Sequence, residues 1–287
     1  MSSMPRFLLS VAIVTCLAAP GVASAQEPAP VRPMMRVNLP IDLTVIGVGG
    51  AAWITTEVLK SKIAPATCRW CSPPGFDDSI ARALRWSNTK TAARISDVGL
   101  YGLAPLAAFG FDAVVVYAGG GTLAEWGTDV IVLLQSMVVA ADLTQIVKFA
   151  VARERPLLEY GSVSPEDRDN RDNNLSFFSG HTSFTFSAAV SAGTLATLKG
   201  YRAAPWIWAT GLTIATATGY LRMAADKHYF SDVMIGAIVG SAVGFVVPWL
   251  HRPSASPSKD AGARLSGMMA SPLPGGGPFV GFSGILD

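Results

Sequence analysis

The sequence predicts an all-α protein, a bundle of about six core helices embedded in a membrane. Half of its 287 residues are apolar and only 15% are charged, with a mean hydropathy of +0.39. This is richer in apolar residues than an ordinary soluble enzyme. Six apolar segments rich in Ala, Leu, Gly and Val are long enough for helices. They cover residues 41–59, 98–117, 130–151, 183–198, 205–221 and 233–250.

Residues 1–25 have the pattern of a secretory signal peptide. Arg6 precedes an apolar run over residues 7–19, and Ala23-Ser24-Ala25 is a small-residue cleavage site. An uncleaved membrane anchor is the alternative interpretation. The short apolar run and the small residues after it favour cleavage.

The mature chain divides into three parts. A linker covers residues 26–40, the main domain covers 41–250, and a Pro/Gly/Ser-rich tail predicted to be disordered covers 251–287. In the last apolar segment Gly236, Gly240 and Gly244 recur at helical spacing, which would allow a neighbouring helix to approach closely. Polar side chains inside the second and third segments keep a soluble all-α core open as an alternative, because charges inside a membrane span are costly. They are Asp112, Asp129, Gln135 and Asp142.

A polar stretch over residues 60–96 separates the first two segments. Within it, residues 79–86 read as a short amphipathic helix carrying basic side chains, either solvated or lying on an anionic membrane surface. Cys68 and Cys71 lie in the same stretch. A second cysteine pair that would complete a zinc site is missing, so a small structural disulfide or two idle thiols is the favoured interpretation.

The first of three basic blocks pairs Lys148 with Arg155, which Pro156 follows. On a continuing helix the two cations would stand two turns apart on one face, and the proline would then end the helix. A guanidinium can bind two oxygens of an oxyanion at once. Cations at a helix end are otherwise common, so this block alone is weak evidence for an oxyanion site.

The formal net charge of the whole chain, +2, does not indicate a nucleic-acid binder.

The second block, Ser179-Gly180-His181, precedes the fourth apolar segment. Backbone N–H groups at a helix N-terminus form an anion site, and glycine allows close approach. Ser179 could add a hydroxyl donor, and His181 could protonate a leaving alkoxide.

The third block spaces Arg222, His228 and Asp232 as Arg-x5-His-x3-Asp. A helix would place His228 and Asp232 within hydrogen-bonding reach, so that the carboxylate fixes the imidazole tautomer and frees the other nitrogen to attack. A metal site is the competing interpretation. Lys and Arg neighbours favour a bound oxyanion over a metal ion.

Together the blocks resemble the type 2 phosphatidic acid phosphatase and vanadium haloperoxidase superfamily, whose motifs are Lys-x6-Arg-Pro, Pro-Ser-Gly-His and Ser-Arg-x5-His-x3-Asp. The resemblance covers roughly residues 41–250. It implies that His228 is the nucleophile, Asp232 its orienting partner and His181 the general acid. It also implies a phosphate clamp of Lys148, Arg155, Arg222, Ser179 and Gly180. Phe178 and Leu221 replace the family's proline and serine.

The resemblance implies a phosphatase that works without a metal, through a phosphohistidine, on lipid phosphates or diphosphates. A soluble periplasmic acid phosphatase of broad specificity is the alternative. A haloperoxidase, the one reading that would need vanadate as a cofactor, is less favoured, and a catalytically dead oxyanion-binding module is disfavoured by the intact motifs. We expect a bacterial-type cell envelope location, in the inner membrane or periplasm.

The side of the membrane that the motifs face stays open. If all six segments cross after a cleaved signal, the motifs fall on the cytoplasmic side, where the sequence also has most of its loop Lys and Arg. Several of those cations are assigned to phosphate, however, and bacterial relatives work on the outer face.

Overall fold

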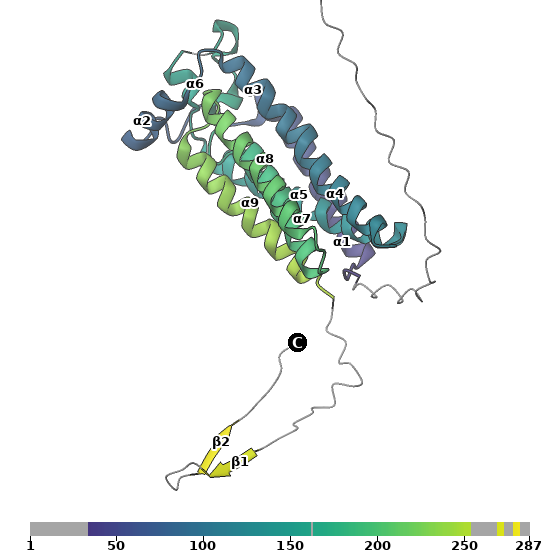
Figure 1. Cartoon of the computed structure of the whole chain (residues 1–287). Coiled ribbons are helices and arrows are strands. Elements are labelled where there is room, and N and C mark those ends of the chain that lie inside the picture. The colour runs from purple at the N-terminus through teal and green to yellow at the C-terminus, as the bar shows by residue number, and fades with distance from the viewer. Residues whose placement is uncertain (1–33, 162, 254–268, 273–277, 282–287) are drawn as a thin grey trace, which may run out of the picture. The chain divides into compact units, whose positions relative to one another are not determined.

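The computed structural model describes residues 34–161, 163–253, 269–272 and 278–281. Within them the domain is a bundle of long helices running side by side (Figure 1). The long helices are α1 (Leu39–Ile63), α3 (Thr89–Val98) with α4 (Ala104–Ala118), α5 (Leu123–Val151), α7 (Gly180–Leu198), α8 (Ala204–Ala224) and α9 (Phe230–Leu250). The all-α prediction with six core helices is therefore confirmed.

The shorter elements gather around the long ones. They are α2 (Gly75–Leu84), the single turn α6 (Pro156–Glu159), and the 3-10 turns η2 (Pro165–Asp167) and η3 (Arg171–Asn174). Helix α2 corresponds to the predicted amphipathic helix between the first two core helices, begun four residues earlier and ended at Leu84 rather than residue 86.

The second core helix is longer than predicted. Helix α3 passes through a π-helical turn, η1 (Gly99–Leu103), into α4, so that Thr89–Ala118 is one helical stretch of 30 residues. The sequence interpretation began this helix at residue 98 because residues 89–98 are polar. Asn38 and Thr122 cap α1 and α5, accepting hydrogen bonds from the backbone N–H groups of Ile41 and Glu125.

Helices α7 and α9 pack backbone to backbone, as the glycine spacing predicted. A Cβ atom added at Gly240 would lie 2.2 Å from the carbonyl oxygen of Ser183, and one at Gly244 would lie 2.6 Å from that of Ser187. Any side chain at either position would therefore push the two helices apart.

Four helical stretches are long and apolar enough to cross a membrane: Leu39–Ile63, Thr89–Ala118, Leu123–Val151 and Phe230–Leu250. Large apolar side chains such as Leu106, Val114 and Ile238 point outward, whereas Asp112 and Asp129 are buried inside the bundle. An apolar exterior around buried polar groups suits lipid rather than water. This arrangement favours the membrane-embedded bundle over the soluble alternative.

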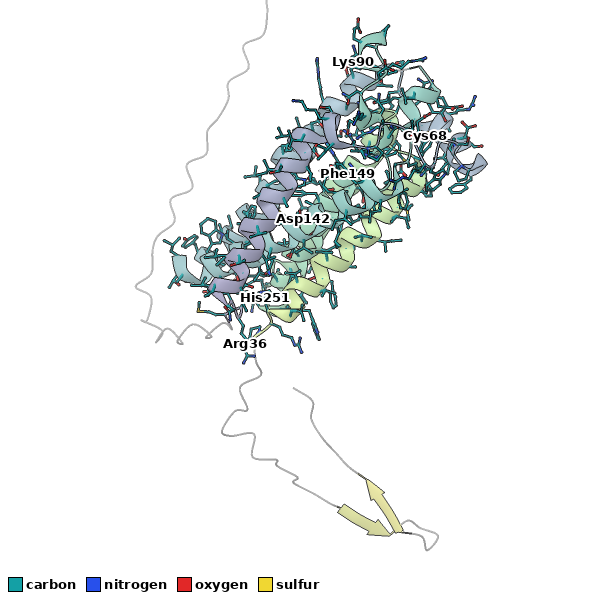
Figure 2. The ribbon with its side chains drawn as sticks, turned by 180° about the vertical axis from the view of Figure 1, so that it is seen from behind. Arg36, Cys68, Lys90, Asp142, Phe149 and His251 are labelled. Carbon is teal, nitrogen blue, oxygen red and sulfur yellow. A yellow bond between two sulfur atoms is a disulfide. The ribbon has the colours of Figure 1, made fainter. Side chains whose placement is uncertain are left out.

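The bundle has two distinct ends. Figure 2 shows Cys68 and Lys90 at one end and Arg36 and His251 at the other. At the second end, the N–H of Arg36 donates to the carbonyl of His251 (2.8 Å). Because the long helices alternate in direction, α1, α5 and α8 finish at the Cys68 end, and α3, α7 and α9 begin there. We call it the site end and the opposite one the far end.

The remaining domain predictions concern the two ends of the chain. The predicted signal peptide, residues 1–25, lies outside the described residues. In the tail, predicted to be disordered, β1 (Met269–Pro272) pairs antiparallel with β2 (Pro278–Gly281), with Met269 opposite Gly281.

Candidate active site

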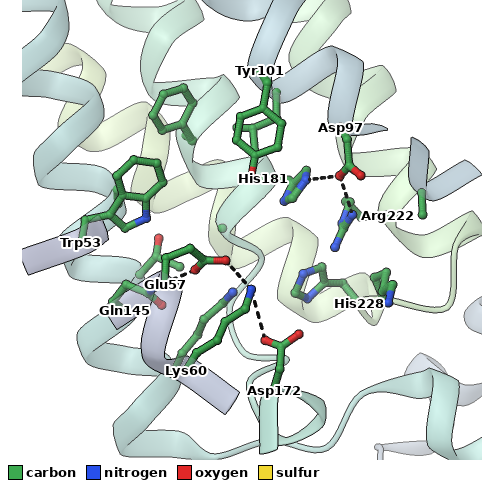
Figure 3. A pocket seen from close by; sticks show the side chains of 18 of the residues that line it. Trp53, Glu57, Lys60, Asp97, Tyr101, Gln145, Asp172, His181, Arg222 and His228 are labelled. Carbon is green, nitrogen blue, oxygen red and sulfur yellow. Dashed lines mark hydrogen bonds and ion pairs between the residues drawn. The ribbon is translucent and has the colours of Figure 1, made fainter. Parts of the chain in front are cut away.

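A cavity of about 350 Å³ opens at the site end. Figure 3 shows His181, Arg222 and His228 on one side of it and Trp53, Glu57 and Gln145 on the other. Of the eight predicted site residues, six line this cavity: Lys148, Arg155, Gly180, His181, Arg222 and His228. Ser179 and Asp232 do not.

Lys148 and Arg155 meet in the cavity, though not in the predicted way. Helix α5 ends at Val151, because Ala152 takes a left-handed conformation with φ 48°. Arg155 is therefore on an extended segment, and Pro156 begins α6 rather than ending α5. The guanidinium of Arg155 makes two hydrogen bonds to Asp172, each 3.0 Å long. Nη2 donates to the carboxylate oxygen Oδ1, and Nε donates to the main-chain carbonyl oxygen.

Asp172 lies in η3, between the first two blocks, and was not predicted as a site residue. Its Oδ1 also lies 3.6 Å from Nζ of Lys60 on α1. Burial alone would raise the pKa of the Asp172 carboxyl, but Arg155, Lys60 and Lys148 together lower it well below its usual range. Asp172 is therefore a permanent counter-charge that holds the cationic wall in place.

Of the two residues predicted to contact phosphate at the start of α7, only Gly180 lines the cavity. Ser179 is the N-cap of α7, and its buried hydroxyl oxygen accepts from the hydroxyl (2.9 Å) and the N–H (3.4 Å) of Thr182. Its side chain thus lies in the cap and outside the cavity wall, in contrast to the predicted direct phosphate contact. Gly180 does line the cavity, and a Cβ there would lie 3.5 Å from Nζ of Lys148.

His181, on the first turn of α7, has a partner that the sequence analysis missed. Its Nε2 lies 2.8 Å from Oδ1 of Asp97, and the same oxygen accepts from Nη1 of Arg222 at 3.4 Å. Asp97 is on α3, one helical turn before Tyr101, whose ring meets the His181 ring edge-on at 6.2 Å. Helical periodicity carried back through residues 89–98 was the only sequence signal that could have found it.

His228 is 1% exposed, and its orientation differs from the prediction. It precedes the N-cap of α9, Tyr229, and so is not on the helix. Its Nδ1 donates to the carbonyl of Ser176 at 2.8 Å, whereas the nearest Asp232 oxygen is 3.7 Å away. A backbone carbonyl therefore holds the Nδ1–H tautomer, which leaves the lone pair on Nε2.

Contrary to the prediction, Asp232 does not bond the imidazole directly but bonds two residues next to it. Its Oδ2 accepts from the hydroxyl of Ser176 at 2.6 Å and from the N–H of Tyr229 at 2.9 Å. The carboxylate thus holds the two residues that hold His228.

The electrostatics of the cavity favour a neutral His228 and an anionic ligand. Burial, followed by Arg155 and Arg222, lowers the pKa of His228 well below its ordinary value, so the imidazole is uncharged at neutral pH. Five cations line the cavity (Lys60, Lys148, Arg155, Arg222 and Lys227) against three carboxylates (Glu57, Asp97 and Asp172). This excess of positive charge matches an oxyanion.

Residues 129–255 match the family model described as the PAP2 superfamily. This part of the chain is therefore similar to the PAP2 superfamily. The match runs from α5 to just beyond α9 and so contains all three predicted blocks. The walls that α1, α3 and η1 add to the cavity lie outside the matched PAP2 region.

Two individual proteins are also similar to this chain. Over 75 residues it is 39% identical to the lipid A 1-phosphatase of Porphyromonas gingivalis, an alignment that covers 26% of this chain and only 16% of that protein. A transmembrane PAP2 type phosphatidylglycerolphosphate phosphatase from Bacillus subtilis aligns with a TM-score of 0.45 and 17% identity. That alignment covers 74% of this chain and 94% of the other.

Proposed function

We propose that this PAP2 protein is a membrane phosphatase that hydrolyses phosphate monoesters or diphosphates of a lipid through a phosphohistidine intermediate. The observation that carries the proposal is the convergence of His228, His181 and an excess of cations on one cavity inside a bundle with an apolar exterior. Cations aimed at a phosphoryl group stabilise the charge that develops on its oxygens in the transition state.

The two histidines suit a two-step displacement. In the first step Nε2 of His228 attacks phosphorus, the bond to the leaving oxygen breaks, and protonated His181 donates a proton to that oxygen. In the second step His181 accepts a proton from water, the water oxygen attacks phosphorus, and the N–P bond breaks. Burial and then Arg222 lower the pKa of His181, and the hydrogen bond to Asp97, 2.8 Å from Nε2, acts against them in favour of the imidazolium that is needed in the first step. No step requires a metal ion.

A lipid substrate is supported by the apolar side chains that line the cavity. Trp53 and Phe184 stack with ring centroids 6.3 Å apart, and Leu100 and Tyr101 add further apolar surface. An apolar wall beside a cationic one fits an amphipathic molecule whose phosphate must reach His228. The similarity to a lipid A 1-phosphatase supports the same substrate class.

The disulfide between Cys68 and Cys71 supports an orientation. It lies at the site end, and disulfides persist in oxidising compartments such as the periplasm. We infer that the site faces the oxidising side of the inner membrane. If α1 crosses the membrane, residue 34 then lies on the cytoplasmic side, which conflicts with cleavage of the predicted signal. Blocking of Cys68 and Cys71 by a membrane-impermeant thiol reagent after mild reduction of whole cells would support the outward orientation, and full protection would contradict it.

The decisive assay measures phosphate release by the purified protein in detergent, from a lipid phosphate and from a water-soluble phosphomonoester. We expect a clear preference for the lipid, unchanged turnover in EDTA, and inhibition by orthovanadate. Loss of turnover in EDTA that returns with a divalent cation would contradict the metal-free mechanism. A preference for the soluble ester would contradict the lipid assignment.

A further inference from the structure

A buried arginine just outside the cavity connects the nucleophile to the disulfide. Arg153 is 1% exposed and belongs to none of the predicted site residues. Its Nη1 bonds Asp232 Oδ1 and donates to the hydroxyl of Ser231 at 2.7 Å, while its Nη2 donates to Asp77 Oδ2 at 2.8 Å. Two buried carboxylates from α2 and α9 thus share one guanidinium, which joins these helices behind the site.

The main chain of Arg153 also contacts the residue that holds His228. The N–H of Ser176 donates to the carbonyl of Arg153 at 2.9 Å. The carbonyl of Ser176 accepts from Nδ1 of His228, and its hydroxyl donates to Asp232. Arg153 therefore holds Ser176 twice, once through its own carbonyl and once through Asp232.

Two aromatic rings enclose the guanidinium. Its Cζ lies 3.9 Å from the centroid of the Trp70 ring and 4.3 Å from that of Tyr229. Stacking on aromatic faces stabilises a buried arginine and restricts the plane in which it can bond. Trp70 is itself held by backbone pairing, since its carbonyl accepts from the N–H of Glu154 at 3.0 Å.

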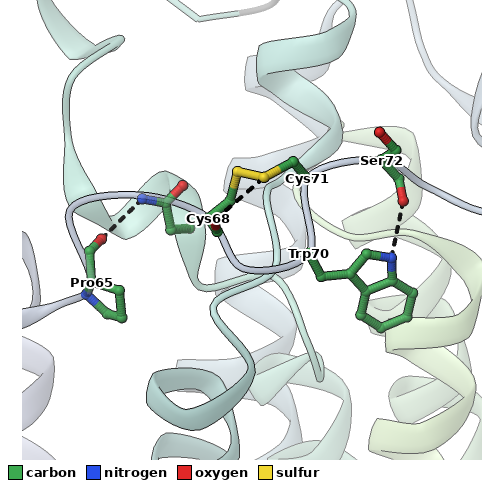
Figure 4. Close-up of a disulfide and its surroundings, with 6 residues drawn as sticks. Pro65, Cys68, Trp70, Cys71 and Ser72 are labelled. Atoms are coloured by element: carbon green, nitrogen blue, oxygen red, sulfur yellow. Dashed lines mark hydrogen bonds between the residues drawn. A yellow bond between two sulfur atoms is a disulfide. The ribbon is translucent and has the colours of Figure 1, made fainter.

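The disulfide closes the short loop that presents Trp70. Figure 4 shows Trp70 between the bonded Cys68 and Cys71, with its indole directed away from the sulfur atoms. The Cα atoms of the two cysteines are 5.4 Å apart. The indole Nε1 donates to the carbonyl of Ser72 at 2.9 Å, which fixes the ring over Arg153. Closing so short a loop removes conformational freedom that an exposed segment would otherwise have.

We propose that Arg153 is a positioning residue for His228 and that the Cys68–Cys71 disulfide, through Trp70, keeps Arg153 in place. The proposal rests on the proposed function of His228. The disulfide then makes the rate of the chemical step depend on the oxidation state of the loop, although both sulfur atoms lie outside the cavity wall.

The first test replaces Arg153 with lysine, which keeps the charge but cannot bond two carboxylates in a plane. We expect kcat to fall by roughly 100-fold, the order of loss that a small misplacement of a reacting group produces, with KM within about twofold of wild type. Arg82→Lys is the matched control, because Arg82 is exposed on α2, where it pairs with Asp78 of its own helix and lies over the Tyr160 ring, outside the cavity.

The readouts separate positioning from folding. Labelling with phosphorus-32 lipid phosphate should show slower phosphohistidine formation in Arg153→Lys, while thermal melting in detergent stays close to wild type. A wild-type kcat would overturn the role of Arg153. An equal fall in kcat and thermal stability, with unchanged labelling rate in the folded fraction, would also overturn it, because the role would then be structural only.

The second test removes the disulfide in Cys68→Ser/Cys71→Ser and, separately, reduces it in the wild type with a dithiol. In that exchange the dithiol is oxidised to its own disulfide, and two electrons and two protons pass to give two cysteine thiols. We expect both treatments to lower kcat by about three- to tenfold, and the double variant to be insensitive to the dithiol. Full wild-type activity of the double variant, or a dithiol effect that persists in it, would contradict the proposal.

Orthovanadate binding separates this inference from the proposed function. If the wild type released no phosphate from any lipid phosphate, the proposed function would fail, but vanadate affinity would still depend on an oriented His228. We expect Arg153→Lys to weaken vanadate binding by at least about tenfold and Arg82→Lys to leave it unchanged. Equal affinities in both variants would overturn the positioning role.

Discussion

The two ends of the bundle bury charge in opposite ways. At the far end, Lys199 follows α7 and its ammonium group contacts Glu125 (2.8 Å) and Asp129, both on α5. The side chain of Lys199 is fully buried and is paired with two carboxylates on the neighbouring helix. At the site end, five cations face three carboxylates around an open cavity.

This difference distinguishes a structural ion pair from a binding site. Removing a charge from water is costly, and at the far end the cost of burying Lys199 is offset by its pairing with two carboxylates. At the site end, part of the positive charge has no carboxylate partner. A phosphate that enters the cavity can supply the missing negative charge. The proposed phosphate chemistry therefore belongs to the end that has an excess of cations.

The largest effect that would break this comparison is the loss of the nucleophile. We expect His228→Ala to lower kcat/KM by roughly 10³-fold or more, since no other group lining the cavity replaces the attacking nitrogen. Phosphate release and phosphorus-32 labelling measure both steps. Retention of labelling in His228→Ala would show that another residue is the nucleophile.

Removal of one of the cations that line the cavity should have the next largest effect. Arg222 lies 6% exposed between Asp97 and the cavity. We expect Arg222→Gln to lower kcat/KM by about 100-fold, because a preorganised donor for the phosphoryl oxygens is lost. A change of less than about threefold, measured with the same lipid phosphate, would show that Arg222 serves only to hold Asp97.

A smaller effect concerns pH and Lys227. Burial, followed by repulsion from Arg155 and Arg222, lowers the pKa of Lys227 to about 8. The ammonium is charged below that pH and neutral above it, so kcat/KM should decline as pH rises through about 8. In Lys227→Arg the charge persists to higher pH, and we expect the decline to move upward by at least one pH unit. An unchanged profile would mean that Lys227 does not assist binding.

The smallest effect on catalysis is expected at the far end. Lys199→Met leaves two buried carboxylates without their cation, which should destabilise the fold by about 3–5 kcal/mol. Because the cavity is at the other end, kcat of the folded protein should stay within about twofold of wild type. Thermal melting and turnover measured on the same sample test the two claims together. A large loss of kcat at unchanged stability would remove the contrast between the ends.

Local sequence patterns predicted the parts of this protein that depend on near neighbours along the chain. Apolar segments of sufficient length predicted the six core helices. Glycines at four-residue spacing predicted the contact of α9 with α7. The three basic blocks predicted six residues that line one cavity, although their roles in phosphate chemistry remain predictions.

Partners from distant segments were beyond local patterns. Asp97 reaches His181 from a helix turn that looked too polar to belong to a core helix. Asp172 reaches Arg155 from a loop outside the three basic blocks. The left-handed residue that ends α5 was also missed, because alanine carries no sequence signal for that conformation.

The sequence by itself therefore determined the helices and the residue types needed for phosphoryl chemistry, because both depend on composition and short spacing. Tertiary structure alone decided which atoms bond. It placed Ser179 in a helix cap and directed Nδ1 of His228 to the backbone carbonyl of Ser176. Asp232 bonds the Ser176 hydroxyl and so acts on the imidazole only through another residue. The physical reason is that hydrogen bonds act over about 3 Å. Only the packing of distant helices determines which groups come within that distance.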